Sequence, residues 1–290
     1  MSKKALRKDF YMEIRRSLGR FLSIFFIVAI GVAFFSGIRS AEPDMRLSGD
    51  AYFDEKNLMD IKVVSTLGLT EDDLRALENV DGIGKAEAGY STDALCTVYD
   101  SKEVVHITSL LPSMNEITVE EGRLPKKDDE CIVDVDFLSS SEYKVGDKIT
   151  FASGNDDDIK DTLKHDTFTI VGSASSPCYI SFHRGSSTIG TGTVSGFVCV
   201  PENSFDMEVY TELYAAVDGA KELTAFTDEY DDRVEDVIDE VEKIRKTRED
   251  ARYEEIVGEA EEKLDDAKKE LDDARKEADD KLNEAKEKLD

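Results

Sequence analysis

The sequence is poor in basic residues and in the residues that build metal and catalytic sites. Its 290 residues include 37 Lys and Arg against 65 Asp and Glu, which gives a net charge of −28. Because a nucleic-acid-binding surface needs clustered Lys and Arg to contact phosphates, this balance argues against nucleic acid as a partner. Residues 1–20 are the exception, with seven basic and two acidic residues. Such a segment is typical of the flank of a membrane helix.

The chain has four cysteines and three histidines. No CxxC pair is present, and no cysteine stands near a histidine at the spacing of a metal site, so we expect no metal ion. The histidines (His106, His165 and His183) are scattered and suggest no Ser-His-Asp or Cys-His arrangement. We expect the cysteines to be small buried residues, although Cys178 and Cys199 could form a disulfide outside the cell. The four are Cys96, Cys131, Cys178 and Cys199.

Two short motifs resemble ligand sites but lack essential residues. GIGKAE, residues 82–87, lacks the leading Gly and the Ser or Thr after Lys of a phosphate-binding loop. The aspartates at 156–158 lack the alternate spacing and the distal Glu of a calcium loop. The Gly-, Ser- and Thr-rich residues 184–196 predict a mobile loop. We therefore predict that the chain is not an enzyme and binds no cofactor.

Residues 21–38, FLSIFFIVAIGVAFFSGI, carry no charge and lie between Arg20 and Arg39. At about 1.5 Å per residue they reach about 27 Å, enough to cross a bilayer core. The basic N-terminal flank predicts a cytoplasmic N-terminus, a location in the plasma membrane and an extracytoplasmic bulk. A cleaved signal peptide is the alternative, but the run is long and no small-x-small cleavage site follows it. The predicted membrane-spanning residues include Phe21, Phe25, Val28, Val32, Phe35 and Ile38.

Residues 1–20 place Leu6, Phe10, Ile14 and Leu18 four apart on a basic helix. This pattern is typical of an amphipathic helix on the cytoplasmic membrane surface, although the segment could also continue the membrane helix.

Residues 41–225 alternate short apolar runs with turn signals, which predicts a strand-rich α+β domain. Thr70 and Asp73 are expected to cap a helix that ends before Gly82. KVGDKITF, residues 144–151, is expected to pair with DTFTIVGSA, residues 166–174. Strands are predicted at residues 60–65, 85–89, 94–99, 103–109, 130–135, 148–152, 167–171, 196–201 and 212–217.

The last segment, residues 226–290, predicts a long charged helix, because from residue 228 onward it contains no Pro and a single Gly, Gly258. Its apolar residues recur at steps of three and four, with one four-residue insertion, as in a coiled coil. Three arrangements are open: a solvated single helix, pairing with a returning arm beyond Asp290 in a truncated chain, or self-pairing of two copies. The predicted stripe is Val234, Val237, Val241, Ile244, Leu264, Ala267, Leu271, Ala274, Ala278, Leu282, Ala285 and Leu289.

Taken in order, these segments resemble the FtsX-like, MacB-type ABC transporter permeases. The resemblance spans about residues 5 to 245 and depends on the order of motifs, since each alone is a generic strand and turn. The motifs are SLGRFLSIFFIVAIGVAFFSGI, GLTEDDLRALENVDGIGKAEAGY, EGRLPKKDDECIVD, YKVGDKITF and DTFTIVGSAS.

The resemblance implies a permease dimer that works with a separate cytoplasmic ATPase, which would account for the missing phosphate loop. It also implies that ATP-driven motion of the membrane helices is passed to the external domain and coiled coil, which engage a substrate, a cell-wall enzyme or an envelope protein. The chain departs from the family where a charged helix replaces the expected second membrane helix near Phe226, and no further membrane helix follows. The alternative is a single-pass, membrane-anchored coiled-coil adaptor or spacer without a transport role.

Overall fold

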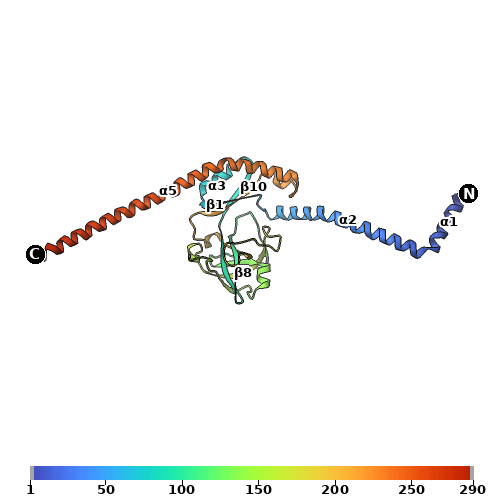
Figure 1. Ribbon diagram of the computed structural model, residues 1–290, viewed down its shortest axis with the longest axis horizontal. Coiled ribbons are helices and arrows are strands. Elements are labelled where there is room, and N and C mark those ends of the chain that lie inside the picture. The colour runs from blue at the N-terminus through green and yellow to red at the C-terminus, as the bar shows by residue number, and fades with distance from the viewer. Residues whose placement is uncertain (1–2, 288–290) are drawn as a thin grey trace.

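The computed structural model describes residues 3–287 and has a strand-rich domain between two long helices (Figure 1). The N-terminal helix α2 and the C-terminal helix α5 leave the domain in opposite directions, so the two chain ends lie far apart. The helices are α1 (Lys3–Arg16), α2 (Leu18–Glu55), α3 (Glu71–Glu78), α4 (Val135–Ser140) and α5 (Asp228–Glu287), with short 3-10 helices η1 (Ile159–Asp161), η2 (Glu202–Ser204) and η3 (Ala220–Glu222).

The strands form two sheets. The small sheet is antiparallel and has the order β1-β10-β2, and α3 and α5 lie against it. The large sheet has the order β3-β4-β9-β6-β8-β5, with β7 paired to β8, and it mixes parallel and antiparallel neighbours. The strands are β1 (Ile61–Leu69), β2 (Ile83–Gly89), β3 (Ser91–Val98), β4 (Ser101–Ser109), β5 (Thr118–Gly122), β6 (Glu130–Asp134), β7 (Lys148–Thr150), β8 (Thr167–Ser175), β9 (Val194–Val200) and β10 (Tyr210–Val217).

The predicted α+β class, with one apolar N-terminal helix and a long C-terminal helix, is confirmed. The antiparallel pairing of β7 with β8 is as predicted, with Ile149 opposite Phe168. Both side chains are fully buried in the core of the large sheet. The Asp73 carboxylate accepts a hydrogen bond from the backbone N–H of Thr70 at 2.8 Å, as expected for the start of α3. Strand β5 was not predicted, because its sequence, TVEEG, is polar and its residues are mostly exposed at a sheet edge.

Helix α2 is longer than the apolar run of residues 21–38 from which we predicted a membrane segment. Within the described residues, α2 alone has the length and hydropathy of a membrane span, with a mean hydropathy of 2.5 in its most apolar window. It continues through Pro43 to Glu55, so residues 41–55 are helical and are not part of the sheet domain that we predicted to begin at residue 41. At its other end, Ser17 separates α2 from α1, and the two helices meet at an angle (Figure 1). This break favours a separate N-terminal helix.

An ion pair beside β6 predicts a pH-dependent stability. The Arg123 guanidinium donates two hydrogen bonds of 2.7 Å to the Glu130 carboxylate, and the Lys126 N–H donates a third at 2.9 Å. Arg123 first, and then Lys126, lower the pKa of Glu130 from 4.5 to about 2. A lowered pKa in the folded state stabilises the fold above the unfolded value, and this contribution is lost as the pH falls from about 4.5 to about 2. We expect Glu130→Gln to reduce the fall of Tm across this window. Glu121→Gln, on exposed β5, is the matched control, and equal pH profiles for wild type and Glu130→Gln would contradict the prediction.

Candidate functional site: the junction of helix α2 with the long C-terminal helix

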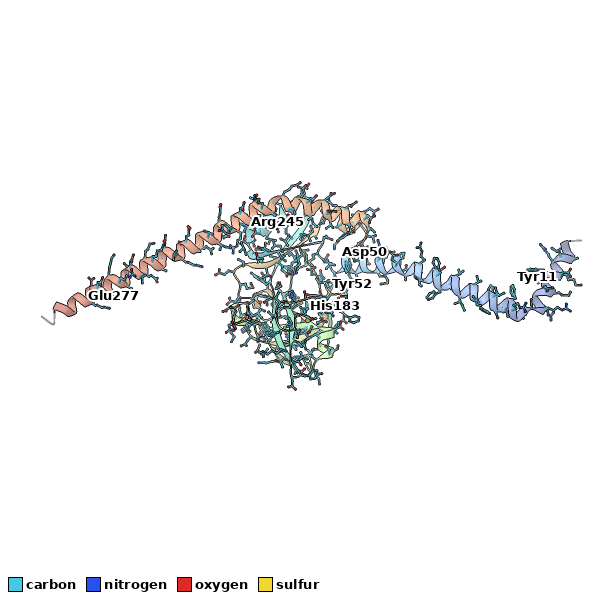
Figure 2. The ribbon with its side chains drawn as sticks, in the orientation of Figure 1. Tyr11, Asp50, Tyr52, His183, Arg245 and Glu277 are labelled. Atoms are coloured by element: carbon cyan, nitrogen blue, oxygen red, sulfur yellow. The ribbon has the colours of Figure 1, made fainter. Side chains whose placement is uncertain are left out.

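The last turns of α2 bind the residues that lead into α5. The Arg46 guanidinium donates a hydrogen bond to the carbonyl oxygen of Phe226. The Asp50 carboxylate accepts one from the backbone N–H of Ala225 at 2.7 Å. The rings of Phe53 and Phe226 have centroids 5.9 Å apart. Residues 46, 50 and 53 share one face of a helix because they are four and three positions apart. One face of α2 therefore contacts the residues that come just before α5, and Figure 2 shows Asp50 of α2 at this contact.

The backbone at this contact has an uncommon conformation. Phe226 has a φ of 64°, in the left-handed region that bulky residues rarely adopt. Such a conformation persists where the surroundings hold it in place. Here the carbonyl group and the ring of Phe226 both contact α2. We infer that α2 helps to fix the turn that directs the chain into α5.

A second set of contacts ties the exit of α2 to the small sheet. The Lys221 ammonium donates to the carbonyl oxygen of Asp54 at 3.1 Å and to the Asn57 side chain at 2.6 Å. The Asp60 carboxylate accepts from the Tyr230 hydroxyl at 2.5 Å and from a backbone N–H of β10. Burial, followed by the hydrogen bond to Asp60, raises the pKa of Tyr230, so its hydroxyl stays protonated and donates to Asp60. Burial, followed by the nearby Asp50 carboxylate, raises the pKa of Asp54.

The first half of α5 is docked on the small sheet. Val237 is 2% exposed and packs in the core of that sheet. The Arg233 guanidinium donates to the carbonyl oxygen of Asp218 at 2.8 Å and 3.1 Å. Further along, Arg248 pairs at 2.7 Å with Asp73, which forms the capping box at the start of α3 with Thr70. Burial raises the pKa of Asp73, but the hydrogen bonds from the Thr70 N–H and from Arg248 outweigh it, so the pKa is lowered overall.

These contacts divide the predicted coiled-coil stripe in two. Val237 is buried in the domain core, and Val234 and Val241 pack against the same cluster. These three positions are therefore core residues of the domain, which corrects their assignment to a coil. Ile244 is half-buried, and the stripe residues described further along α5 are exposed, Leu264 by 55% and Leu271 by 53%. Ala267, Ala274 and Ala278 are exposed as well, the side chains of Leu282 and Ala285 are not described, and Leu289 lies outside the described residues.

The predicted membrane-spanning side chains are all exposed on α2. Their exposed fractions run from 44% for Phe21 to 66% for Phe35. The sites at the far end of α2 were not predicted as functional. The sequence does show that Arg46, Asp50 and Phe53 share one face of a helix. It does not show that their partners are the residues near 226.

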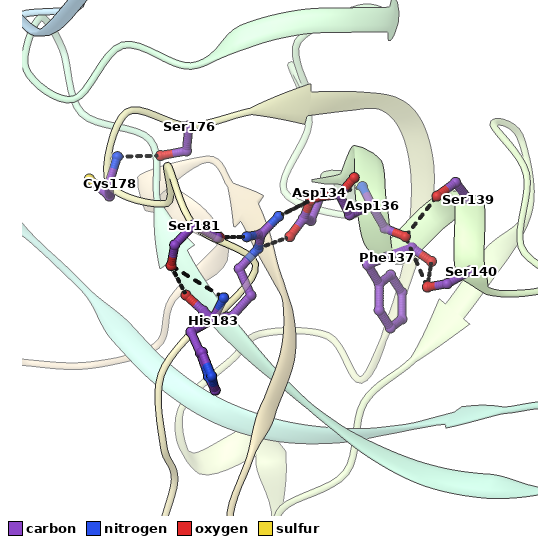
Figure 3. Close-up of polar contacts among 10 residues, drawn as sticks. Asp134, Asp136, Phe137, Ser139, Ser140, Ser176, Cys178, Ser181 and His183 are labelled. Atoms are coloured by element: carbon purple, nitrogen blue, oxygen red, sulfur yellow. Dashed lines mark hydrogen bonds and ion pairs between the residues drawn. The ribbon is translucent and has the colours of Figure 1, made fainter. Parts of the chain in front are cut away.

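The segment after β8 is tied to the domain by a buried ion pair. Arg184 donates to Asp134 at 2.5 Å and to Asp136 at 2.7 Å, and its guanidinium also donates to the carbonyl oxygen of Ser181. The Asp134 side chain is 1% exposed and also accepts from the N–H of Asp136 at the start of α4. Figure 3 shows Asp134, Asp136 and Ser181 converging at this point. Residues 184–196, predicted as a mobile loop, are thus anchored at their first residue.

The described residues contain no group of three His, Cys, Asp or Glu side chains that could hold a metal ion. All four cysteines lie among them as free thiols; Cys96, Cys131 and Cys199 are buried and Cys178 is exposed. Burial raises the pKa of the Cys96 and Cys199 thiols to about 12, so these two thiols are poor nucleophiles.

Comparisons with known proteins give similarities of structure only. No protein-family model and no curated protein matches the chain. The chain is similar to the extracellular domain of the ABC-type transporter YknZ from Gram-positive bacteria, with 13% identity and a TM-score of 0.35 over 55% of this chain and 78% of that one. It is also similar to the periplasmic region of MacB from Actinobacillus actinomycetemcomitans, with 10% identity and a TM-score of 0.33 over 64% of this chain and 84% of that one. These values do not establish membership of a family.

Proposed function

We propose that the chain is the N-terminal part of a permease subunit of an FtsX-like, MacB-type ABC transporter. A separate cytoplasmic ATPase moves α2, and the junction passes this movement to α5. The proposal depends on one observation, the continuity of α2. This helix runs without a break from the apolar segment to Glu55, and its last turns hydrogen-bond to Ala225 and Phe226, just before α5 begins. The order of the sequence motifs supports the same family.

The geometry suits the transmission of a movement over a distance. Residues 39–55 extend α2 by about 25 Å beyond the apolar run, at about 1.5 Å per residue. A tilt of α2 in the membrane would displace its far end, where Arg46, Asp50 and Phe53 contact the chain before α5. Beyond Ile256, α5 is exposed through residue 281, and it extends about 45 Å from Ile256 to residue 287 at the same rise. A small change of direction at the junction would therefore become a large displacement of the arm.

In this proposal the N-terminus and α1 lie at the cytoplasmic face and the bulk of the chain is extracytoplasmic. Two permease copies act together with the ATPase. The exposed half of α5 engages a substrate, a cell-wall enzyme or an envelope protein.

The first test addresses the ATPase. Chemical cross-linking in native membranes is expected to join residues 3–16 of the full chain to a protein with an ABC-type nucleotide site. Cross-links only to extracytoplasmic proteins, all through α5, would instead establish the second candidate, a membrane-anchored adaptor. The exposed, highly charged half of α5 favours that candidate as the alternative.

The second test addresses the junction. Spin labels at Leu271 of the two copies are expected to change their separation when ATP is added to the assembled transporter. Arg46→Ala removes the contact with Phe226 and is expected to abolish most of this change while ATP hydrolysis continues. Glu42→Ala is the matched control, because it removes only the pair between Glu42 and Arg46 within α2. A full ATP-dependent change in Arg46→Ala would rule out the junction as the route of transmission.

A further inference from the structure

A cavity of about 210 Å³ lies between the two sheets of the domain. The small sheet contributes Lys62 of β1 and Tyr214 of β10 to its wall, and the large sheet contributes Phe197 of β9. Tyr179, in the segment after β8, also lines it. No part of the proposed function uses this cavity.

The two charged side chains of the wall, Lys62 and Glu212, form an ion pair with each other. The Glu212 side chain is 8% exposed and pairs with Lys62 at 2.7 Å. It also accepts hydrogen bonds from Ser91 at 2.7 Å and from the Tyr214 hydroxyl. Burial raises the pKa of Glu212, but the hydrogen bond from Lys62 and those from Tyr214 and Ser91 outweigh it, so the carboxyl stays ionised and paired. A charged ligand would therefore find no unpaired charge of the opposite sign here.

Three neutral polar side chains of the wall, those of Asn115, His106 and Ser109, also have partners within the protein. The Asn115 side chain accepts from the backbone N–H of Met59 at 3.0 Å. His106 Nδ1 lies 2.6 Å from the Asp93 carboxylate. The Ser109 hydroxyl accepts from a backbone N–H at 2.9 Å. These three side chains therefore offer little to water in the cavity, and an apolar group that displaces weakly held water gains affinity.

Three aromatic rings are among the residues that line the cavity. The rings of Tyr179 and Phe197 are stacked, with centroids 5.1 Å apart and planes at 8°. The Tyr214 ring lies beneath the Lys62 ammonium, which is 5.8 Å from its centroid. Flat aromatic walls favour a ligand that is itself flat and aromatic, because offset stacking adds to the gain from burial.

We propose that this cavity is a binding site for a neutral aromatic molecule of one or two fused rings. The volume supports that size, since an apolar cavity of about 150 Å³ is enough for benzene. Neutrality follows from the paired charges of Lys62 and Glu212. The cavity also touches the exit of α2: Met59 lines it, and the N–H of Asn115 donates to the carbonyl oxygen of Asn57 at 2.9 Å. A bound ring would therefore contact the segment that joins α2 to β1.

The chain offers a direct measurement because it contains no tryptophan. Indole excited beyond the tyrosine absorption band then fluoresces without a protein background. When indole is added to the full chain in lipid nanodiscs, we expect a saturable blue shift of its emission, beyond that caused by empty nanodiscs. Indole-3-acetate, which carries a carboxylate, is expected to bind at least about tenfold more weakly, because its charge would be buried without a partner.

A pair of variants at one position locates the site. Cys178 lines the cavity from an exposed loop position, so a larger residue is tolerated there better than in the core. Cys178→Phe is expected to fill the cavity and weaken indole binding at least about tenfold, whereas Cys178→Ser keeps the space and is expected to bind indole as wild type does. Tyrosine circular dichroism of both variants checks that they fold. The absence of saturable binding to wild type, or equal binding to folded Cys178→Phe, would overturn the proposal.

Discussion

Replacing Arg184 by methionine is expected to lower the free energy of unfolding by about 3–5 kcal/mol, the usual effect of breaking a buried ion pair from one side. The Arg184 side chain is 7% exposed, and its partner Asp134 is 1% exposed. The substitution leaves the Asp134 carboxylate buried with one remaining hydrogen bond, from the N–H of Asp136. Urea-induced unfolding of the full chain, followed by tyrosine fluorescence, measures the change.

Two further variants separate the cost of the unpaired charge from the loss of packing. The double variant Arg184→Met with Asp134→Asn removes both charges and is expected to be more stable than Arg184→Met alone. Arg245→Met is the control, because Arg245 is 61% exposed and its pairs with Glu242 and Glu249 lie on the surface of α5. Surface pairs contribute at most about 1 kcal/mol. If Arg184→Met and Arg245→Met cost the same, the pair at Asp134 is not the anchor that we describe.

Val237→Asp is expected to release the first half of α5 from the small sheet, at a cost of at least about 3 kcal/mol, because it places a carboxylate without a partner in an apolar core. Hydrogen exchange is expected to increase in β1, β2 and α3, which share this core. The large sheet should keep its protection, since its core is a separate cluster.

Two other substitutions test whether the effect of Val237→Asp comes from its contact with the small sheet. Ile238→Asp makes the same change at the next position of α5, where the side chain is 39% exposed, and is expected to have a small effect. Gly82→Ala acts from the opposite side of the contact. Its Cβ would lie 2.6 Å from Val237 Cγ2, and Gly82 has a φ of 91°, so the alanine is expected to loosen α5 as well. Unchanged exchange in the small sheet of Val237→Asp would contradict the docking of α5.

The strands were predictable where burial imposes a period of two along the chain. In β4, residues 105, 107 and 109 are buried and residues 106 and 108 are less so, and the predicted strand at 103–109 includes this alternation. The β7–β8 pair was predictable because its partners are close in sequence and a polar turn separates them. The polar edge strand β5 was not predicted, because it has neither an alternation of buried residues nor a partner strand close in sequence.

The candidate site was predictable only in its parts. The apolar run from Phe21 to Ile38 and the charged helix after residue 228 are both visible in the sequence. Their attachment is not, because Arg46 and Phe226 are brought together by the whole intervening domain. The same reason explains the wrong assignment of Val237. Its spacing from Val234 and Val241 is that of any apolar helical stripe, and spacing alone does not tell a coiled-coil seam from a face that packs on a sheet.

The local features of this protein follow from its sequence alone: the long apolar helix, the alternation of the strands, the cap of α3 and the long charged helix. Each depends on side chains within a few turns or one strand, so composition and period are enough to reveal it. The tertiary structure decided the length over which α5 is docked, the anchoring of Arg184 on Asp134 and the cavity between the sheets. These features depend on contacts between residues far apart in the sequence, such as Arg184 with Asp134 and Arg248 with Asp73, and such contacts exist only once the chain has folded.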